Sequence, residues 1–253
     1  MDSAAPMDGF ADLPSPDGFR VLRDDHGISV LMIDRTTKRN ALTRAMWSAV
    51  PTVLNEIAGG TRALIVAGAG GVFCAGADIG ELREVYGDPD HARAYHATNL
   101  AAEAALAGFP HPTVAAISGW CVGGGLQLAL ACDIRVADRT ARFGLTPAKL
   151  GVIYPAAPAL RLARLVGPAR AKYLMFTADL IDAARAYDFG LIEEITDGPQ
   201  RAVELARTIA SRSPRSIRAA RETINTGSAP AEDPADVPEG LAAFLERRPP
   251  RFR

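Results

Sequence analysis

Apolar and polar positions along most of the chain follow two alternating periods, which predict a mixed α/β fold. Short apolar runs are typical of buried strands, whereas apolar positions three and four residues apart are typical of helices. The predicted strands cover residues 19–23, 28–33, 63–67, 113–117 and 134–137. The predicted helices cover residues 43–58, 90–107, 126–132, 158–166, 169–176 and 182–189. Strands that alternate with helices in this way indicate the α/β class.

The two ends of the chain differ from this core. Residues 1–17 are rich in Pro, Asp and Ala, and we expect them to form a flexible tail. After residue 200 the pattern predicts only helices, at residues 200–211, 214–226 and 237–247. We therefore expect a core over residues 18–199 and a C-terminal helical region over residues 200–253. The apolar faces of that region need a partner to cover them.

Composition narrows the class of protein. Hydrophobic residues make up 48% of the 253 residues, which is enough for a large core. The 28 basic and 29 acidic residues give a net charge of -1, so the charge does not indicate a nucleic-acid partner. No apolar run approaches the roughly 18 residues of a membrane span, and the charged-then-apolar order of a signal peptide is missing. These features predict a cytoplasmic protein.

The cysteines and histidines do not form a recognisable site. The three cysteines include no CxxC pair, so neither a disulfide framework nor a zinc site is predicted. Cys74 has no neighbouring base, and we expect it to be a small buried residue rather than a nucleophile. None of the four histidines lies at a metal-ligand spacing, so we expect all of them to be bystanders: His26, His91, His96 and His111.

Two short loops carry the strongest chemical signal. Residues 73–79 read FCAGADI and residues 118–127 read SGWCVGGGLQ; each loop follows a predicted buried strand and leads into a helical segment. Small residues let a backbone approach closely, and two backbone N–H groups about 3 Å from one oxygen form an oxyanion hole. The helix that follows the three glycines adds its dipole to this effect. The alternative is that the glycines merely close tight strand-to-helix turns.

Four motifs in order make the chain similar to the crotonase (enoyl-CoA hydratase/isomerase) superfamily. They are IDRTTKRNALT at residues 33–43, FCAGADI at 73–79, GWCVGGGLQLALACDIRVA at 119–137 and FGLTPAKLGV at 143–152. The ending AFLERRPPRF at residues 243–252 also resembles the family's C-terminal signature. The resemblance implies a spiral of ββα repeats and a C-terminal helical region that packs on neighbouring subunits, in a homotrimer or a dimer of trimers (a hexamer).

The same resemblance implies where an acyl-CoA would bind. It assigns the two oxyanion donors to the backbone N–H groups of Ala77 and Gly124, with the thioester carbonyl between them. It assigns the CoA moiety to Lys38, Arg39, Ala41, Leu42, Ala75, Asp78 and Ile79. Lys38 and Arg39 can meet phosphates, although two adjacent basic residues are also typical of a solvated turn. Beyond the CoA moiety of the substrate we expect no cofactor, metal, nucleic acid or membrane.

One departure from the family pattern bears on the reaction. Hydratases of this family carry a glutamate three residues after the second donor glycine and another twenty residues further on, as general acid and base. Here these positions are Gln127 and Pro147. Neither side chain can exchange a proton as a carboxylic acid can, so ordinary water addition is not expected.

Decarboxylation needs an enolate but no base, because loss of carbon dioxide leaves the electron pair behind. The segment TPAKLGVIY at residues 146–154 resembles the corresponding stretch of methylmalonyl-CoA decarboxylase, in which the tyrosine orients the departing carboxylate. The resemblance assigns that role to Tyr154, and we place Gln127 beside it at the reacting centre. The alternative for Tyr154 is a partly buried residue with a satisfied hydroxyl.

Two other functions stay open. The first is a hydratase or isomerase of fatty-acid metabolism whose acid and base come from elsewhere, with Asp78, Glu81, Glu84 and Glu103 as candidates. The second is a non-catalytic acyl-CoA-binding subunit that has kept the fold, although intact donor loops argue against this alternative. The sequence favours an acyl-CoA enzyme of enolate type, with base-free lyase chemistry as its reaction.

Overall fold

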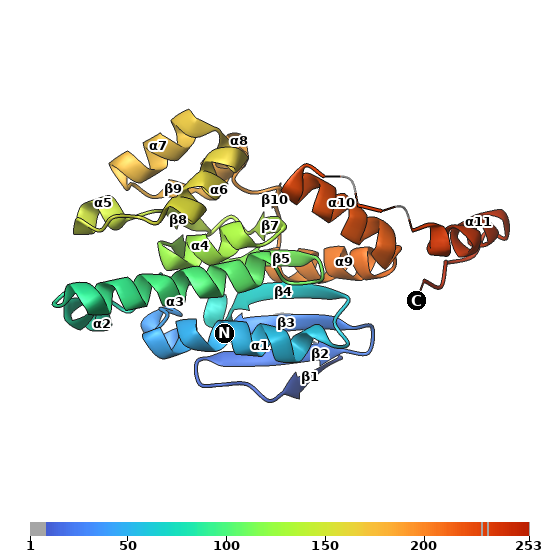
Figure 1. The fold of residues 1–253 in the computed structure, drawn as a ribbon, viewed down its shortest axis with the longest axis horizontal. Coiled ribbons are helices and arrows are strands. Elements are labelled where there is room, and N and C mark those ends of the chain that lie inside the picture. Colours follow the sequence, from blue (N-terminus) through green and yellow to red (C-terminus); the bar gives the residue numbers. More distant parts are fainter. Residues whose placement is uncertain (1–8, 229, 232, 253) are drawn as a thin grey trace.

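A seven-stranded sheet runs through the centre of the computed structural model, which describes residues 9–228, 230, 231 and 233–252 (Figure 1). In spatial order its strands are β1 (Phe10–Leu13), β2 (Phe19–Asp24), β3 (Ile28–Ile33), β4 (Ala63–Gly68), β5 (Thr113–Ile117), β7 (Ile134–Ala137) and β10 (Glu194–Ile195). The pairs β1–β2 and β2–β3 are antiparallel, and the pairs from β3 to β10 are parallel. Parallel strands joined through helices confirm the predicted α/β class.

The expected tail over residues 1–17 is corrected by β1. Residues 10–13 pair with β2 in antiparallel register, with Phe10 opposite Asp24 and Leu13 opposite Val21. The segment was not recognised because only four residues pair, and Asp12 interrupts the apolar pattern on the outer edge of the sheet. Residues 1–8 lie outside the described residues.

Each face of the sheet is covered by a different set of helices. On one face, alternate residues such as Val30, Ile65 and Val114 pack against Ala202 and Val203 of α9 (Gly198–Ala210). The period of two along β3, β4 and β5 sends the intervening side chains to the opposite face. α9 is therefore part of the core, which corrects the expectation that a separate helical region begins at residue 200.

The helices after α9 are much less buried. α10 (Pro214–Thr226) has no buried residue, and α11 (Val237–Leu245) buries only Ala243 among its nine residues. Figure 1 shows α11 extending away from the sheet beside the C-terminus. The C-terminal helical region thus begins after α9.

The opposite face of the sheet packs against α1 (Arg44–Ala58), α3 (Pro89–Ala107) and α4 (Gly124–Ala131). α1 begins as predicted at Thr43, whose side chain accepts a hydrogen bond from the Met46 N–H at 3.2 Å. Trp47, fully buried, lies on this helix, and α3 crosses α1 through an extended contact. These helices enclose the carboxyl ends of β4 and β5, where parallel sheets commonly bind ligands.

A second, smaller sheet, whose strands lie on both sides of α4 in the sequence, completes the fold. Its three strands are β6 (Trp120–Val122), β8 (Arg142–Gly144) and β9 (Ile181–Asp182). The remaining helices are α2 (Ile79–Val85), α5 (Pro147–Leu150), α6 (Ala156–Val166), α7 (Pro168–Thr177) and α8 (Ala183–Phe189). α2 and the short strands had no clear sequence signal because they are brief and lie within the motif-bearing loops.

Candidate active site

The two small-residue loops are held together by their backbones. The Cys74 N–H donates to Trp120 O at 2.7 Å, and the Val122 N–H donates to Cys74 O at 3.0 Å. Gly76 has a φ of 103°, and a Cβ at this position would lie 2.9 Å from Val122 O. Only glycine fits this conformation and this approach, so the small residues have the structural role that the sequence predicts.

The N–H groups of Ala77 and Gly124 are free among the described residues. Leu42 forms hydrogen bonds with the residues on either side of Ala77, at 2.8 Å and 2.9 Å, and leaves the Ala77 N–H unused. Gly124 is the first residue of α4, so its N–H has no acceptor within the helix. A Cβ on Gly124 would lie 3.7 Å from Ala77 N. The two free donors are thus close together, as an oxyanion hole requires.

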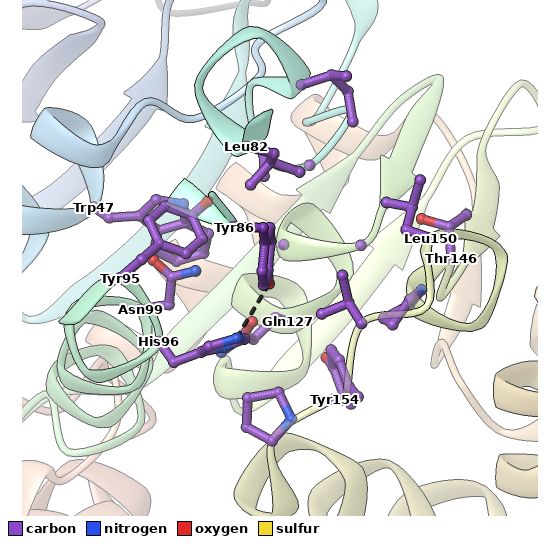
Figure 2. Close-up of a pocket in the computed structure, with 18 of the residues that line it drawn as sticks. Trp47, Leu82, Tyr86, Tyr95, His96, Asn99, Gln127, Thr146, Leu150 and Tyr154 are labelled. Carbon is purple, nitrogen blue, oxygen red and sulfur yellow. Dashed lines mark hydrogen bonds between the residues drawn. The ribbon is translucent and has the colours of Figure 1, made fainter. Parts of the chain in front are cut away.

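Both donors open into one pocket, whose lining is largely apolar and aromatic. Figure 2 shows Trp47, Tyr95 and Asn99 grouped on one side of it and Tyr154 on another. Among the described residues that line the pocket there is no Asp, Glu, Lys or Arg. Charge that develops in the pocket is therefore met chiefly by backbone dipoles and neutral side chains.

Gln127 and Pro147, which occupy the two glutamate positions of hydratases, line this same pocket. Gln127 is only 4% exposed, and its Nε2 donates to Glu103 Oε2 at 3.1 Å. Pro147 begins the short helix α5 and offers no polar side-chain atom. Glu103 lies behind Gln127 and is not itself among the lining residues.

Tyr154 also lines the pocket, in the loop between α5 and α6. Its hydroxyl is fully buried and has no hydrogen-bond partner among the described residues. Burial, and secondarily the negative charge of Glu103, raise the pKa of the Tyr154 hydroxyl, so it stays protonated at neutral pH. A buried hydroxyl without a partner costs about 1–3 kcal/mol, and in native structures such a group often marks a position where water or a ligand binds.

Six of the seven residues expected to bind CoA separate into three groups, and Asp78 stands apart from them. Ala75 and Ile79 line the pocket. Lys38 and Arg39 lie on an exposed turn outside the pocket, and the Arg39 guanidinium lies 5.6 Å from the ring centre of Trp120. The side chains of Ala41 and Leu42 belong to the core, at 9% and 0% exposed, which leaves only their backbones for a ligand.

Asp78 has a structural role beside the first donor. Its carboxylate accepts hydrogen bonds from Arg35 at 2.6 Å and from the Gly80 N–H at 2.8 Å, where it caps α2. The Arg35 contact is the main cause of a lowered pKa for Asp78. Asp78 therefore fixes the end of the loop that carries Ala77.

α3 supplies pocket residues that the sequence pattern did not identify. Tyr95, His96 and Asn99 line the pocket, which corrects the expectation that every histidine is a bystander. His96 Nε2 lies 3.1 Å from the Tyr86 hydroxyl (Figure 2). The only available signal was the four-residue spacing of Tyr95 and Asn99, which places both on one face of a helix.

Other candidate chemistry is not supported. Burial raises the pKa of the Cys74 thiol to about 12, so this cysteine is a neutral buried residue, as expected. No cluster of three or more potential metal ligands occurs among the residues that the structure describes. Within the same residues, no helix has the length and apolar character to cross a membrane.

Comparisons with known proteins agree with this geometry. The family model for enoyl-CoA hydratase/isomerase matches residues 23–235. The mitochondrial methylglutaconyl-CoA hydratase of Rattus norvegicus is 32% identical, over 98% of this chain and 88% of the relative. The crystal structure of an enoyl-CoA hydratase/isomerase family protein from Hyphomonas neptunium has a TM-score of 0.87 at 34% identity, over 93% of this chain and 97% of that chain.

A second solved structure, the enoyl-CoA hydratase of Bacillus anthracis, has a TM-score of 0.83 at 30% identity, over 96% of this chain and 98% of that chain. The likeness of residues 146–154 to methylmalonyl-CoA decarboxylase is not shown by these relatives and stays a prediction. The predicted superfamily is confirmed by the match over most of the chain. The protein belongs to the enoyl-CoA hydratase/isomerase family.

Proposed function

We propose that the protein binds a short acyl-CoA and stabilises the enolate of its thioester between the N–H groups of Ala77 and Gly124. Both donors are free, adjacent and open to the pocket. Backbone donors at such a site are worth about 3–4 kcal/mol each in the transition state. We expect no cofactor beyond the CoA moiety, with Lys38 and Arg39 at its phosphate end.

The favoured reaction is decarboxylation of a malonyl-type CoA, and one observation supports it: none of the described residues that line the pocket carries a carboxylate. In this reaction the bond from Cα to the carboxylate breaks, carbon dioxide leaves, and the electron pair becomes the enolate. A proton from water then completes the product. Negative charge moves from a pocket wall, whose described residues include no Lys or Arg, to the two N–H donors, so the site favours the transition state over the bound substrate. In this proposal the Tyr154 hydroxyl, which has no hydrogen-bond partner among the described residues, donates to the carboxylate.

The second candidate is hydration or isomerisation of an enoyl-CoA by an unusual acid or base. It is favoured by the relatives, which are named as hydratases, and by two titratable groups near the pocket. Glu103 contacts Gln127, and His96 lines the pocket. The other candidates are less suitable: Asp78 is paired with Arg35, and Glu81 accepts from the Arg44 N–H at 2.7 Å.

A substrate screen decides between these candidates. Purified protein is incubated with malonyl-CoA, methylmalonyl-CoA and crotonyl-CoA, and the products are identified by mass. We expect loss of carbon dioxide from a malonyl-type substrate and no hydration at the roughly 10–10³ per second of a good enzyme. Hydration at such rates with no decarboxylation would overturn the favoured reaction.

We also propose that the protein assembles as a trimer or a dimer of trimers. α10 and α11 expose large apolar side chains, including Ile224 and Phe244 at 82% each and Leu245 at 80%. Apolar side chains gathered in one region are typical of subunit interfaces. Light scattering at micromolar concentration tests this, and a stable monomer would contradict it.

A further inference from the structure

Three side chains from three helices form a hydrogen-bonded series that ends on the pocket wall, and two of them, Glu103 and Gln127, are buried. Glu103 of α3 is 1% exposed. It accepts hydrogen bonds from Gln127 of α4 and from Arg161 of α6, each at 3.1 Å. Of these three residues, Gln127 alone lines the pocket. The series therefore connects a charged group on α6 to one pocket side chain.

The hydrogen bonds among Gln127, Glu103 and Arg161 fix the orientation of the Gln127 carboxamide. A carboxylate paired with Arg161 can only accept hydrogen bonds, so Gln127 must turn its amide nitrogen toward Glu103. The carbonyl oxygen of the same amide accepts no hydrogen bond from the described residues and is not enclosed by them. It therefore faces the pocket. Without Glu103, the amide could occupy either of its two orientations.

We propose that Glu103, held by Arg161, is a positioning residue that directs the Gln127 carbonyl oxygen toward the acyl group as a hydrogen-bond acceptor. The proposal rests on the proposed function, because it describes the acyl end of the same site. The unpartnered Tyr154 hydroxyl supplies a donor in the same wall. The wall then recognises a short acyl group with a polar substituent, which accepts from Tyr154 while Gln127 holds a water or an O–H group.

A purely structural role explains the arrangement less well. A buried ion pair adds little net stability compared with well-packed apolar residues of the same size. The Arg161 side chain is 37% exposed whereas that of Glu103 is 2% exposed, so most of the desolvation cost falls on the carboxylate. The desolvation cost of placing the Glu103 carboxylate directly behind Gln127 is explained if Glu103 orients Gln127.

A double-mutant cycle tests the proposal. We would measure kcat/KM for Glu103→Gln, Gln127→Ala and the double variant with the acyl-CoA that the screen identifies. Glu103→Gln keeps the shape of the side chain but can present an amide to Gln127. It should lower kcat/KM about five- to twentyfold in the wild-type background and have no further effect in the Gln127→Ala background.

Binding supplies a readout that does not depend on turnover. Propionyl-CoA and 3-hydroxypropionyl-CoA cannot lose carbon dioxide, and their dissociation constants differ only through the polar end of the acyl group. Glu103→Gln should shrink the ratio between them while leaving propionyl-CoA binding unchanged. An unchanged ratio, or a loss in kcat/KM that is equal with and without Gln127, would overturn the proposal.

Matched controls separate positioning from general damage to the fold. Glu193 is paired with the buried Arg135 at 2.5 Å, outside the pocket lining. Glu193→Gln should leave kcat/KM unchanged, and Arg161→Lys should retain more activity than Arg161→Met. If crotonyl-CoA is hydrated instead, decarboxylation fails as the function, and the same cycle run with crotonyl-CoA still decides the role of Glu103.

Discussion

The thioester end and the acyl end of the pocket are built in different ways. At the proposed thioester end, the free backbone N–H groups of Ala77 and Gly124 lie in loops that are joined by hydrogen bonds of 2.7–3.0 Å. At the proposed acyl end, side chains form the wall, and Gln127 and Tyr154 are among its polar residues. Under the proposed function, the backbone loops stabilise the enolate, whereas substitutions in the wall can change the reaction.

The residues that support the donor loops differ from the pocket lining in how completely their polar atoms are paired. Asn40, beside the first donor loop, is fully buried and donates to Ala69 O at 2.9 Å. Around the rest of the pocket, three lining residues have buried polar atoms without a partner among the described residues: Trp47 Nε1, Asn99 Oδ1 and Tyr154 Oη. Unpaired buried atoms are rare in native proteins, so their concentration here indicates where a ligand or water completes the structure.

The largest effect on turnover is expected from a substitution at the thioester end. Gly124→Pro removes one donor at the first position of α4, where helices tolerate proline. Turnover should fall about 10²- to 10³-fold, because one oxyanion donor is lost. The change is measured as kcat on the substrate from the screen, together with the melting temperature.

Gly124→Ala is the matched control for this substitution. Its Cβ would lie 2.7 Å from Trp47 Cζ2, so it introduces similar crowding but keeps the N–H. We expect Gly124→Ala to lose clearly less activity than Gly124→Pro. Equal losses would show that crowding against Trp47, and not the missing donor, is responsible.

At the acyl end, Tyr154→Phe should lower kcat/KM about tenfold to a hundredfold if the hydroxyl bonds to the acyl group in the transition state. The same substitution removes a buried hydroxyl without a partner. Unfolding free energy should therefore stay equal or rise by about 1 kcal/mol. Lower activity with undiminished stability distinguishes a functional hydroxyl from a structural one.

Tyr187→Phe, on the exposed surface of α8, is the control and should change neither kcat/KM nor the unfolding free energy. Full activity of Tyr154→Phe on every substrate would remove the residue that favours decarboxylation. The protein would then remain a family member whose reaction is unassigned.

Gln127→Glu tests whether the wall accepts the carboxylate that hydratases place there. The new carboxylate would lie next to Glu103, which is 3.1 Å from the Gln127 amide nitrogen. Like charge and burial raise the pKa of the new group in the folded state above its unfolded value. The protonated form of the new carboxyl group therefore favours the folded state at a pH below its unfolded pKa. This stabilisation is lost as pH rises through the folded pKa.

We expect Gln127→Glu to lose about 2 kcal/mol of unfolding free energy relative to wild type between about pH 5 and about pH 8, measured by urea unfolding. Crotonyl-CoA hydration should not appear. The double variant Glu103→Gln with Gln127→Glu restores an amide beside a carboxylate and should recover most of the stability. A single variant that is as stable as wild type at both pH values would contradict this account.

The contrast between the two ends also explains what the sequence could predict. The strands at residues 28–33, 113–117 and 134–137 have the predicted bounds, because short, mostly apolar runs are typical of buried parallel strands. The donor loops could be located because close backbone approach restricts the residue type at positions such as Gly76.

The side-chain wall could not be assembled in the same way. Glu103 is separated in the sequence from Gln127 by 24 positions and from Arg161 by 58, and no local sequence pattern indicates contacts over such separations. His96 was not identified because its place in the pocket depends on how α3 crosses the sheet. Likewise, the pairing of residues 10–13 depends on an edge strand with little apolar signal.

The smallest expected effect comes from the support of the first donor loop. Asp78→Asn removes the ion pair with Arg35, while the backbone bonds of Leu42 still hold Ala77. We expect a loss of about 1 kcal/mol in unfolding free energy at neutral pH, and a fall of about two- to fivefold in kcat/KM. The low folded-state pKa of Asp78 adds stability above its unfolded pKa, which is lost as pH falls through the folded value. The difference in unfolding free energy between wild type and Asp78→Asn should therefore become smaller below about pH 4, as measured by acid unfolding.

Asp90→Asn, in an exposed pair with Arg93, is the control and should change neither stability nor turnover. If Asp78→Asn instead lowers turnover as much as Gly124→Pro does, the thioester end depends on side-chain support as strongly as the acyl end does.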